Sequence, residues 1–284
     1  MATTGYTGGV NTRDSEGNTK LMQAVIDGNE QEVARLVKYK SIINAKNRDG
    51  KTAIMIAAEE TYSGTRILKI LIAAHAKLDE VDNDGSTALM WATYSDNAEA
   101  VKILLKAGAG KDLQDSRGKT AVMFAVESDK IQSLNALIAA KVNLEIKDET
   151  GWTAMHWAAS TGSTDSLKAI IRAGAKKDIQ DSDGWTPLAH AVDRKYLEVV
   201  KLLLSSDADP TIKTNDQKTP FDIAREDTLP DRDILYLLKN AMDKWEAKLL
   251  RREEEKKAEQ MIAINGAIND ILDEVDDSKK KGKK

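Results

Sequence analysis

The sequence predicts an all-α fold, a solenoid of seven stacked helix-turn-helix units that ends in an extended C-terminal helix. The first observation is a Gly-x-Thr motif that recurs at steps of 33, 35, 33, 33, 33 and 33 residues. A fixed period of this length indicates a solenoid. The second observation is an alanine at one helical phase in every unit, and the third is a helical pattern of apolar residues near the C-terminus. The motif starts at Gly17, Gly50, Gly85, Gly118, Gly151, Gly184 and, with glutamine replacing glycine, Gln217.

The first helix of each unit is predicted to begin directly after the motif threonine. A threonine hydroxyl can accept a backbone N–H left unpaired at a helix start, which makes this residue a good N-cap. Pro187 and Pro220 follow two of these threonines, at the helical position where a missing N–H costs nothing. Alanine then recurs five residues after every threonine, which predicts close packing between helices of neighbouring units. These alanines are Ala24, Ala57, Ala92, Ala125, Ala158, Ala191 and Ala224.

The second helix of each unit carries a pair of aliphatic residues and is predicted to end in the left-handed conformation. Gly108 and Gly174 stand at this end in two units, as expected for a helix C-cap. His75, Lys141 and Asp207 occupy the same place elsewhere. Because a side chain in the left-handed region costs about 1 kcal/mol, these three junctions are predicted to be the weaker ones.

This pattern resembles the ankyrin repeat. Residues 181–192 read Asp-Ser-Asp-Gly-Trp-Thr-Pro-Leu-Ala-His-Ala-Val, close to the family pattern Asp-x-x-Gly-x-Thr-Pro-Leu-His-x-Ala-Ala. The resemblance covers about residues 11–240 and implies an ankyrin-repeat solenoid with β-hairpin-like turns. It also implies a scaffold that binds another protein or peptide on its concave face without catalysis. The identity of that partner does not follow, because one fold serves many functions.

The predicted domain organisation has four parts. Residues 1–13 form a flexible N-terminus, and 14–245 form the ankyrin-repeat domain, in which Trp245 packs within the terminal cap. Residues 246–277 form a charged C-terminal helical extension, whose apolar residues could fold back on the repeats or pair with another helix. Residues 278–284 form a basic, disordered tail.

Composition excludes several classes of function and cofactor. The chain has 284 residues, no cysteine and a net charge of −4, which excludes disulfides, thiol catalysis and thiolate metal sites. The near balance of charge does not favour nucleic acid as a partner. The N-terminus lacks the features of a secretory signal, and no apolar run approaches the ~20 residues that span a bilayer. We therefore expect a soluble, cytoplasmic protein with no membrane insertion.

The sequence contains no motif that indicates catalysis, metal binding or cofactor binding. The three histidines are His75, His156 and His190, and none belongs to a metal-binding or catalytic motif. His156 occupies the position where the resemblance implies a structural histidine. Methionine takes that position in four other units, where packing is favoured over a soft metal site. The chain is expected to be no enzyme, with no metal and no cofactor. These methionines are Met22, Met55, Met90 and Met123.

The aromatic residues of units three to six are the candidate site for a partner. The ankyrin resemblance places the residue before the recurring alanine on the concave face and the residue after the turn glycine at the hairpin base, and it implies that both positions contact the ligand. Trp and Tyr are enriched in interface hot spots, so these rings would supply affinity, while the turn acids with Lys51, Lys119 and Lys218 would tune specificity. The alternative interpretation is that the rings pack against one another and stiffen the stack. The candidate contact residues are Trp91, Tyr94, Phe124, Trp152, Trp157, Trp185 and His190.

Two further interpretations remain open. Trp152 and Trp157 have the spacing of an aromatic pair that captures methylated lysine in the ankyrin domains of some histone lysine methyltransferases. In this chain Ser160 replaces an acidic residue and His190 replaces a tryptophan of that pattern, so cation recognition is a lesser alternative. The other interpretation is a structural role in which the C-terminal helix pairs with a second copy of the chain.

Overall fold

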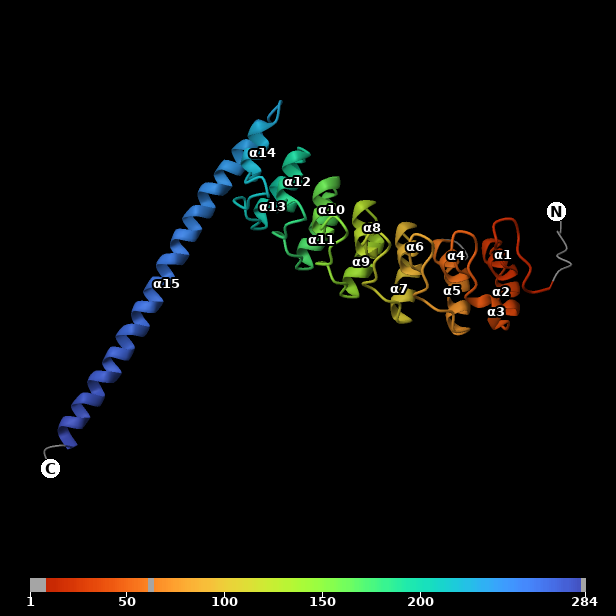
Figure 1. The fold of residues 1–284 in the computed structure, drawn as a ribbon, viewed down its shortest axis with the longest axis horizontal. Helices are drawn as coiled ribbons and strands as arrows, with labels where there is room; N and C mark the ends of the chain where they lie inside the picture. The colour runs from red at the N-terminus through yellow and green to blue at the C-terminus, as the bar shows by residue number, and fades with distance from the viewer. Residues whose placement is uncertain (1–8, 61–63, 282–284) are drawn as a thin grey trace.

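The computed structural model describes residues 9–60 and 64–281, in which helices stack side by side in an elongated row (Figure 1). The predicted all-α solenoid with an extended C-terminal helix is confirmed. The first helices of the seven repeats are α1 (Lys20–Ile26), α4 (Ala53–Glu59), α6 (Ala88–Tyr94), α8 (Ala121–Glu127), α10 (Ala154–Thr161), α12 (Pro187–Asp193) and α14 (Pro220–Glu226). The second helices are α2 (Glu30–Leu36), α5 (Gly64–Ala73), α7 (Ala98–Lys106), α9 (Ile131–Ala139), α11 (Thr164–Arg172), α13 (Leu197–Ser205) and the start of α15 (Arg232–Lys281), with a short α3 (Lys40–Ile43) after α2.

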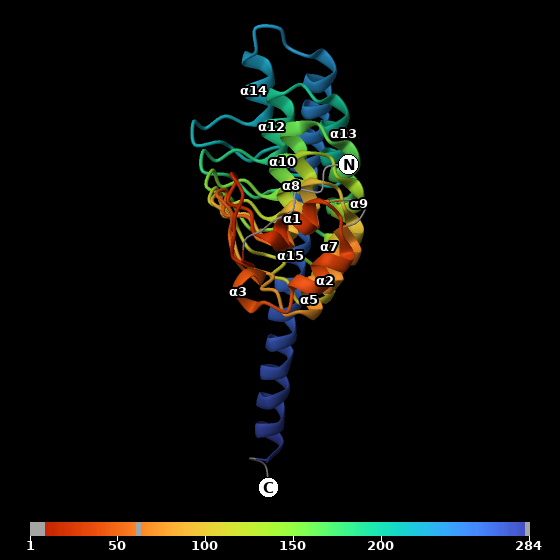
Figure 2. The same cartoon turned by 90° about the vertical axis from the view of Figure 1, so that its right-hand side faces the viewer.

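The repeats form three layers, which Figure 2 shows along the stack: turns on one side, first helices in the middle and second helices on the other side. Each first helix contacts the first helix of the next repeat, and each second helix contacts the next second helix. The core therefore extends along one axis, as expected for a repeat protein.

The motif threonines are the N-caps of all seven first helices, as predicted. The third helical residue reaches back to the threonine backbone N–H in six of these helices. In four of them the acceptor is a methionine sulfur, 3.3–3.5 Å from the nitrogen. His156 Nδ1 takes this role in α10 at 3.1 Å, and Asp222 takes it in α14, also at 3.1 Å. The methionines are thus packing and capping residues.

The turns are joined to one another along the stack. Within a turn, the Asp148 N–H donates to the Trp152 carbonyl at 2.9 Å, which gives the predicted hairpin-like shape. Between turns, the Ser182 N–H donates to the Thr150 carbonyl at 3.2 Å. Gly151 has a φ of +83°, and a Cβ at this position would lie 2.7 Å from the Ser182 nitrogen. Glycine is therefore required both by conformation and by the close approach of the next turn.

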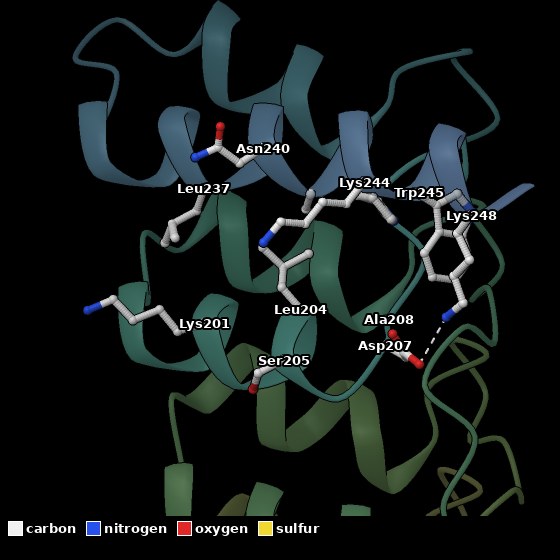
Figure 3. Close-up of a pocket in the computed structure, with 12 residues that line it drawn as sticks. Lys201, Leu204, Ser205, Asp207, Ala208, Leu237, Asn240, Lys244, Trp245 and Lys248 are labelled. Atoms are coloured by element: carbon white, nitrogen blue, oxygen red, sulfur yellow. Dashed lines mark hydrogen bonds and ion pairs between the residues drawn. The ribbon is translucent and has the colours of Figure 1, made fainter.

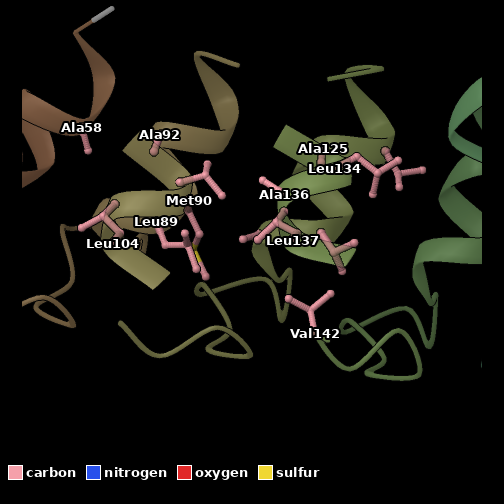
Figure 4. Packing of buried hydrophobic residues seen from close by; sticks show 14 of the residues in the cluster. Ala58, Leu89, Met90, Ala92, Leu104, Ala125, Leu134, Ala136, Leu137 and Val142 are labelled. Atoms are coloured by element: carbon pink, nitrogen blue, oxygen red, sulfur yellow. The ribbon is translucent and has the colours of Figure 1, made fainter. Parts of the chain in front are cut away.

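The core is aliphatic and tightly packed, and all seven recurring alanines are buried in it. Figure 4 shows Ala92 and Ala125 at equivalent places in neighbouring repeats, with leucines such as Leu104 and Leu137 beneath them. Because the alanine positions lie between adjacent first helices, a larger side chain would push those helices apart.

The helix ends at the repeat junctions adopt the predicted left-handed conformation. Gly108 and Gly174 have φ values of +92° and +88°. His75, Lys141 and Asp207 have φ values of +63°, +55° and +65°. The backbone shape is thus the same whether or not glycine is present, and the three side-chain-bearing junctions carry the conformational cost.

The start of α15 is the second helix of the last repeat and covers the end of the stack, as predicted. Ile234 and Leu238 are buried against α13 and α14. Trp245 lines a groove of about 330 Å³ between α13 and α15, and Lys248 Nζ lies 3.0 Å from an Asp207 carboxylate oxygen (Figure 3). Beyond this point the helix leaves the repeats and projects away from them (Figure 1).

The two ends of the chain lie partly outside the described residues. Of the N-terminal segment predicted to be flexible (1–13), residues 1–8 are not described, whereas Arg13 pairs with Thr19 in a β-bridge. Of the basic tail predicted to be disordered (278–284), residues 278–281 continue α15 and 282–284 are not described. No helix in the described part of the chain, α15 included, has an apolar stretch long enough to cross a lipid bilayer.

Candidate functional site

The candidate site is built from pairs of side chains that meet at three of the junctions between repeats. The residue after the turn glycine of one repeat lies against the residue before the recurring alanine of the next. Lys51 Nζ lies 3.3 Å from the centroid of the Trp91 ring, and Lys119 Nζ lies 3.7 Å from the centroid of the Trp157 ring. An ammonium group this close to an aromatic face is a cation–π contact.

These two lysines are also ion-paired, so their charge is satisfied within the fold. Lys51 Nζ lies 2.8 Å from Glu59, and Lys119 Nζ lies 2.8 Å from Glu127. Lys119 Nζ is also 5.8 Å from the centroid of the Phe124 ring, and the residue is buried. The ring faces of Trp91 and Trp157 that meet these lysines are therefore covered by the protein itself, an inward role that the sequence pattern did not predict.

The turn aspartates fix the edges of the rings. The indole N–H of Trp91 donates to Asp82 at 2.8 Å, and that of Trp157 donates to Asp148 at 2.9 Å. Asp181 is within hydrogen-bonding distance of both the Trp152 indole nitrogen, at 3.0 Å, and His190 Nε2, at 2.7 Å. These carboxylates also accept backbone N–H groups of their own turns and are buried. They act as turn formers, as predicted, and offer little surface to a partner.

Repeats five and six differ because an aromatic ring replaces the lysine. Trp152 lies over His190 with a centroid separation of 4.6 Å, and it meets Trp157 edge-on at 4.9 Å. The Trp185 ring lies 5.2 Å from that of His190. Together these four rings line a shallow, open pocket of about 390 Å³. We call Trp152, Trp157, Trp185 and His190 the aromatic pocket.

The rim of the aromatic pocket is polar and was not identified from the sequence. It comprises Thr150, Asp183, Asp193 and Arg194, with the Arg194 Nε 3.9 Å from Asp193. Within residues 9–60 and 64–281 no side chain donates to the carboxylate of Asp183, which is exposed. The signal was available in the repeat register, because Asp183 stands at a turn tip and Asp193 at the end of a first helix, two places where these side chains are exposed.

Of the remaining candidate residues, Trp91 and Tyr94 form a separate pair in repeat three, whereas Phe124 of repeat four lies beside Lys119, which also contacts Trp157. Tyr94 meets Trp91 edge-on at a centroid separation of 6.0 Å and is 56% exposed. Phe124 is half-buried beside Lys119 and packs on the core. The structure thus brings together four of the seven predicted contact residues and leaves the other three outside the aromatic pocket, and all of them except the exposed Tyr94 are partly buried.

His156 lies beneath the aromatic pocket and has a structural role. Its Nδ1 accepts from the Thr153 N–H, so the proton of the neutral ring is assigned to Nε2, which lies 3.2 Å from the Trp185 carbonyl. Burial lowers its pKa from 6.5 to about 4, because the charged imidazolium would lose its hydration. The neutral ring therefore connects the helix cap of repeat five to the turn of repeat six.

The described residues do not bring together three His, Asp or Glu side chains that could hold a metal ion. The arrangement of rings, hydrogen-bonded carboxylates and an open pocket has the features of a binding site. The chemistry available at the pocket is contact with apolar groups and attraction of positive charge, since ring faces and carboxylates both favour cations.

Known proteins similar to this chain were found at the levels of sequence and structure. The chain is 43% identical over 68 residues to the Notch-regulated ankyrin repeat-containing protein of Xenopus tropicalis, and 41% identical over 68 residues to that of Homo sapiens. Each match covers 24% of this chain and 57% of the relative, so the chain spans little more than half the length of these relatives. The crystal structure of the ankyrin repeat domain of Bcl-3, a member of the IkappaB protein family, is similar in fold. It has a TM-score of 0.72 and 23% identity and covers 79% of this chain and 99% of that domain.

The family described as ankyrin repeats, in three copies, matches residues 5–77, 61–148 and 130–214. These matches together span residues 5–214, which is most of the chain. The chain therefore belongs to the ankyrin repeat family.

Proposed function

We propose that this chain is a non-catalytic scaffold that binds a protein or peptide on the concave face of repeats three to six. Ankyrin repeats are generally protein–protein interaction modules. The observation that carries the finer proposal is the aromatic pocket, where the ring faces are left open although a lysine covers the equivalent ring at two other junctions. A partner side chain inserted there would contact several rings at once.

Affinity would come mainly from burial of these rings. Tryptophan buries a large area and loses little side-chain entropy on binding, which is why a few such residues dominate many interfaces. Trp185 is the best placed of the four. It is partly exposed, and among the described residues nothing accepts a hydrogen bond from its indole nitrogen. Tyr94, 56% exposed, would extend the contact toward repeat three.

The test is affinity capture from the source cell with the wild-type chain and Trp185→Ala. We expect Trp185→Ala to lose the captured partner while its helical signal and melting temperature stay close to wild type. Tyr236→Ala is the matched control, because it removes an aromatic ring that is 70% exposed on α15, outside the concave face. Loss of the partner in both variants, or in neither, would remove the basis for placing the partner at the pocket.

A second candidate function is recognition of a cationic group by the aromatic pocket. It is supported by the ammonium groups of Lys51 and Lys119, which already lie on tryptophan faces at equivalent junctions. The open carboxylate of Asp183 would add attraction, whereas Arg194 at the rim would reduce it. Ser160, at the place of the acidic residue in the methyl-lysine pattern, is buried, so the acidic rim would have to come from repeat six.

Tryptophan fluorescence can test this second candidate with tetramethylammonium as the probe. We expect saturable quenching that is weakened at least threefold by Asp183→Asn and abolished by Trp185→Ala. A neutral tert-butyl alcohol of similar shape should bind more weakly. Equal binding of the neutral probe would show that the pocket selects for apolar shape and not for charge.

A cytoplasmic location is part of the same proposal. It is supported by the absence of cysteine from the sequence, which fits a reducing compartment. A fluorescent fusion that collects in another compartment would contradict it.

A further inference from the structure

A groove of about 330 Å³ lies between α13 and α15, in the layer of second helices (Figure 3). The second helices of the preceding repeats have seven to ten residues, whereas α15 has 50. The added turns of α15 carry Trp245 and Lys248 alongside the end of α13, where both residues line the groove. The continuation of α15 past the usual end of a second helix therefore creates the groove.

The floor of the groove is apolar. Leu204 of α13 and Leu237 of α15 line it from the two helices, together with the half-buried ring of Trp245. Ala208 and Ala241 also line it, and their small side chains leave room for an incoming group. An apolar cleft with a few charged groups around it is typical of a binding site. An occupant can thus bury an apolar side chain beside Trp245.

The rim of the groove is positively charged. Its charged residues are Lys201, Lys244, Lys248 and Asp207. Lys248 Nζ lies 3.0 Å from Asp207, and Lys201 Nζ lies 2.7 Å from Glu198. Lys244 has no hydrogen-bond or ion-pair partner among the described residues. Figure 3 shows its side chain extended from α15 toward α13. An unpaired ammonium group therefore lies at an apolar groove, where a carboxylate would complement it.

A second groove adjoins the first on the other side of α13. Lys201 and Ser205 line both grooves. The second, of about 400 Å³, reaches Lys168 of α11, which pairs with Asp165 at 3.1 Å. Packed helices lie about 8–10 Å apart, so a path from α15 across α13 to α11 is about 16–20 Å long. An extended peptide of about six residues covers that length. The two grooves together therefore fit a chain segment better than a single small molecule.

The charge of this surface favours an acidic partner. Four lysines line the two grooves against two acids, Glu198 and Asp207, which gives +2 on a chain whose net charge is −4. Complementary charge steers association and disfavours partners of like charge. The pairs that Lys168 and Lys201 form are exposed and contribute little, so carboxylates of a partner can replace them. A peptide in which apolar residues alternate with acidic ones meets the requirements of both floor and rim.

We propose that the two adjoining grooves, from α15 across α13 to α11, bind an acidic, amphipathic segment of a partner protein. An apolar side chain of that segment enters beside Trp245, and its carboxylates meet Lys244 and Lys201. The lining residues of this surface differ from those of the aromatic pocket. The inference therefore stands independently of what binds the aromatic pocket.

Fluorescence anisotropy with the full chain tests the charge requirement. The probe is a short fluorescein-labelled peptide in which leucine alternates with pairs of glutamates. We expect saturable binding that Lys244→Glu weakens about fivefold or more, because it reverses the unpaired charge at the groove. Lys239→Glu is the matched control, since Lys239 is exposed on the same helix but does not line the groove. Absence of saturable binding, or equal weakening by both variants, overturns the proposal.

The apolar floor is tested by filling the groove. Ala241→Phe adds a ring beside Trp245 and should abolish binding of the peptide, whereas Ala263→Phe, farther along the exposed part of α15, should leave it unchanged. Circular dichroism should show the same helical signal in both variants. Unchanged binding by Ala241→Phe would mean that the groove is not the site. Sodium dodecanoate is the competing probe. If it binds and the peptide does not, the groove takes a small anionic amphiphile and the assigned partner is wrong.

Discussion

Two junctions between repeats, one from repeat four to five and one from repeat five to six, use the same position in opposite ways. At the first, Lys119 lies on the Trp157 ring and pairs with Glu127, so that the ring face is covered. At the second, Trp152 takes the lysine position and lies over His190, beside an open pocket. The scaffold is the same, but one junction is closed and the other is available to a partner.

The difference shows that an aromatic ring at a repeat junction is not by itself available for contact. Whether it is available depends on the side chain that the preceding repeat places over it. Trp157 contributes to both junctions, since one part of its ring meets Lys119 and another lines the aromatic pocket. Trp185 belongs to the open junction alone. The comparison therefore separates rings that stabilise the stack from rings that are free to bind.

The largest expected effect compares Trp157→Ala with Trp185→Ala. Removing Trp157 leaves a cavity, an unpaired Asp148 carboxylate oxygen and an uncovered Lys119, so we expect a loss of about 3 kcal/mol in unfolding free energy. Removing Trp185 breaks no hydrogen bond of its side chain and should cost less than about 1 kcal/mol. Urea denaturation of both variants checks this. Equal losses would mean that the second junction is also a packed structural contact.

The repeat register, the caps and the buried alanines could all be predicted from the sequence, because each depends on residues close in the chain. The left-handed helix ends at His75, Lys141 and Asp207 followed from the same register. The covering of Trp91 and Trp157 by lysines could not be predicted in this way. Those contacts join residues of different repeats, and their geometry depends on how far one repeat is displaced relative to the next.

Protonation of His156, which lies beneath the aromatic pocket, should destabilise the junction between repeats five and six. The folded pKa is about 4 and the ordinary value is 6.5, so the unfolded chain takes up the proton first as the pH falls. The stability contributed by the neutral ring is complete above the ordinary pKa and declines as the pH drops toward 4. Between about pH 7 and pH 5 the expected loss is about 2 kcal/mol.

His156→Met is the control for this pH dependence. Methionine caps the same helix position in repeats one to four, as Met123 does through its sulfur. The variant should keep the fold and lose about 2 kcal/mol less than the wild type over the same pH interval. Denaturant titrations at the two pH values measure the difference. If the two proteins lose stability in parallel, other titrating groups account for the acid sensitivity.

Neutralising Lys119 tests the closed junction directly. Lys119→Met keeps the apolar stem but removes the ammonium from Trp157 and Glu127, and we expect a cost of about 1–2 kcal/mol. Lys218→Met is the matched control. Lys218 pairs with Glu226 in the same way, but its side chain is 44% exposed, against 7% for Lys119. An exposed pair of this kind contributes little, so the control should change stability much less than Lys119→Met does.

The polar residues at the rim of the aromatic pocket could not be predicted from the sequence. The seven candidate rings were found because aromatic residues are rare in this chain and fall in register. Asp183, Asp193 and Arg194 were not, because charged residues are common at turn tips and helix ends throughout the sequence. Only the positions of Trp152 and Trp185 in three dimensions distinguish these three polar residues from their equivalents in other repeats.

The smallest expected effect on stability concerns the left-handed backbone conformation at the end of the second helix of a repeat. Lys141 is held at a φ of +55°, where glycine is unstrained, so Lys141→Gly should stabilise the chain by about 0.5–1 kcal/mol. Gly108 occupies the same helix end one repeat earlier, with open space around its Cα. Gly108→Lys should therefore cost about the same amount for conformational reasons alone. If thermal denaturation shows opposite shifts of similar size, the junctions share one backbone geometry and differ only in their side chains. If the two substitutions shift stability in the same direction, side-chain contacts at Lys141 outweigh the backbone cost, and the open and closed junctions cannot be compared on a common scaffold.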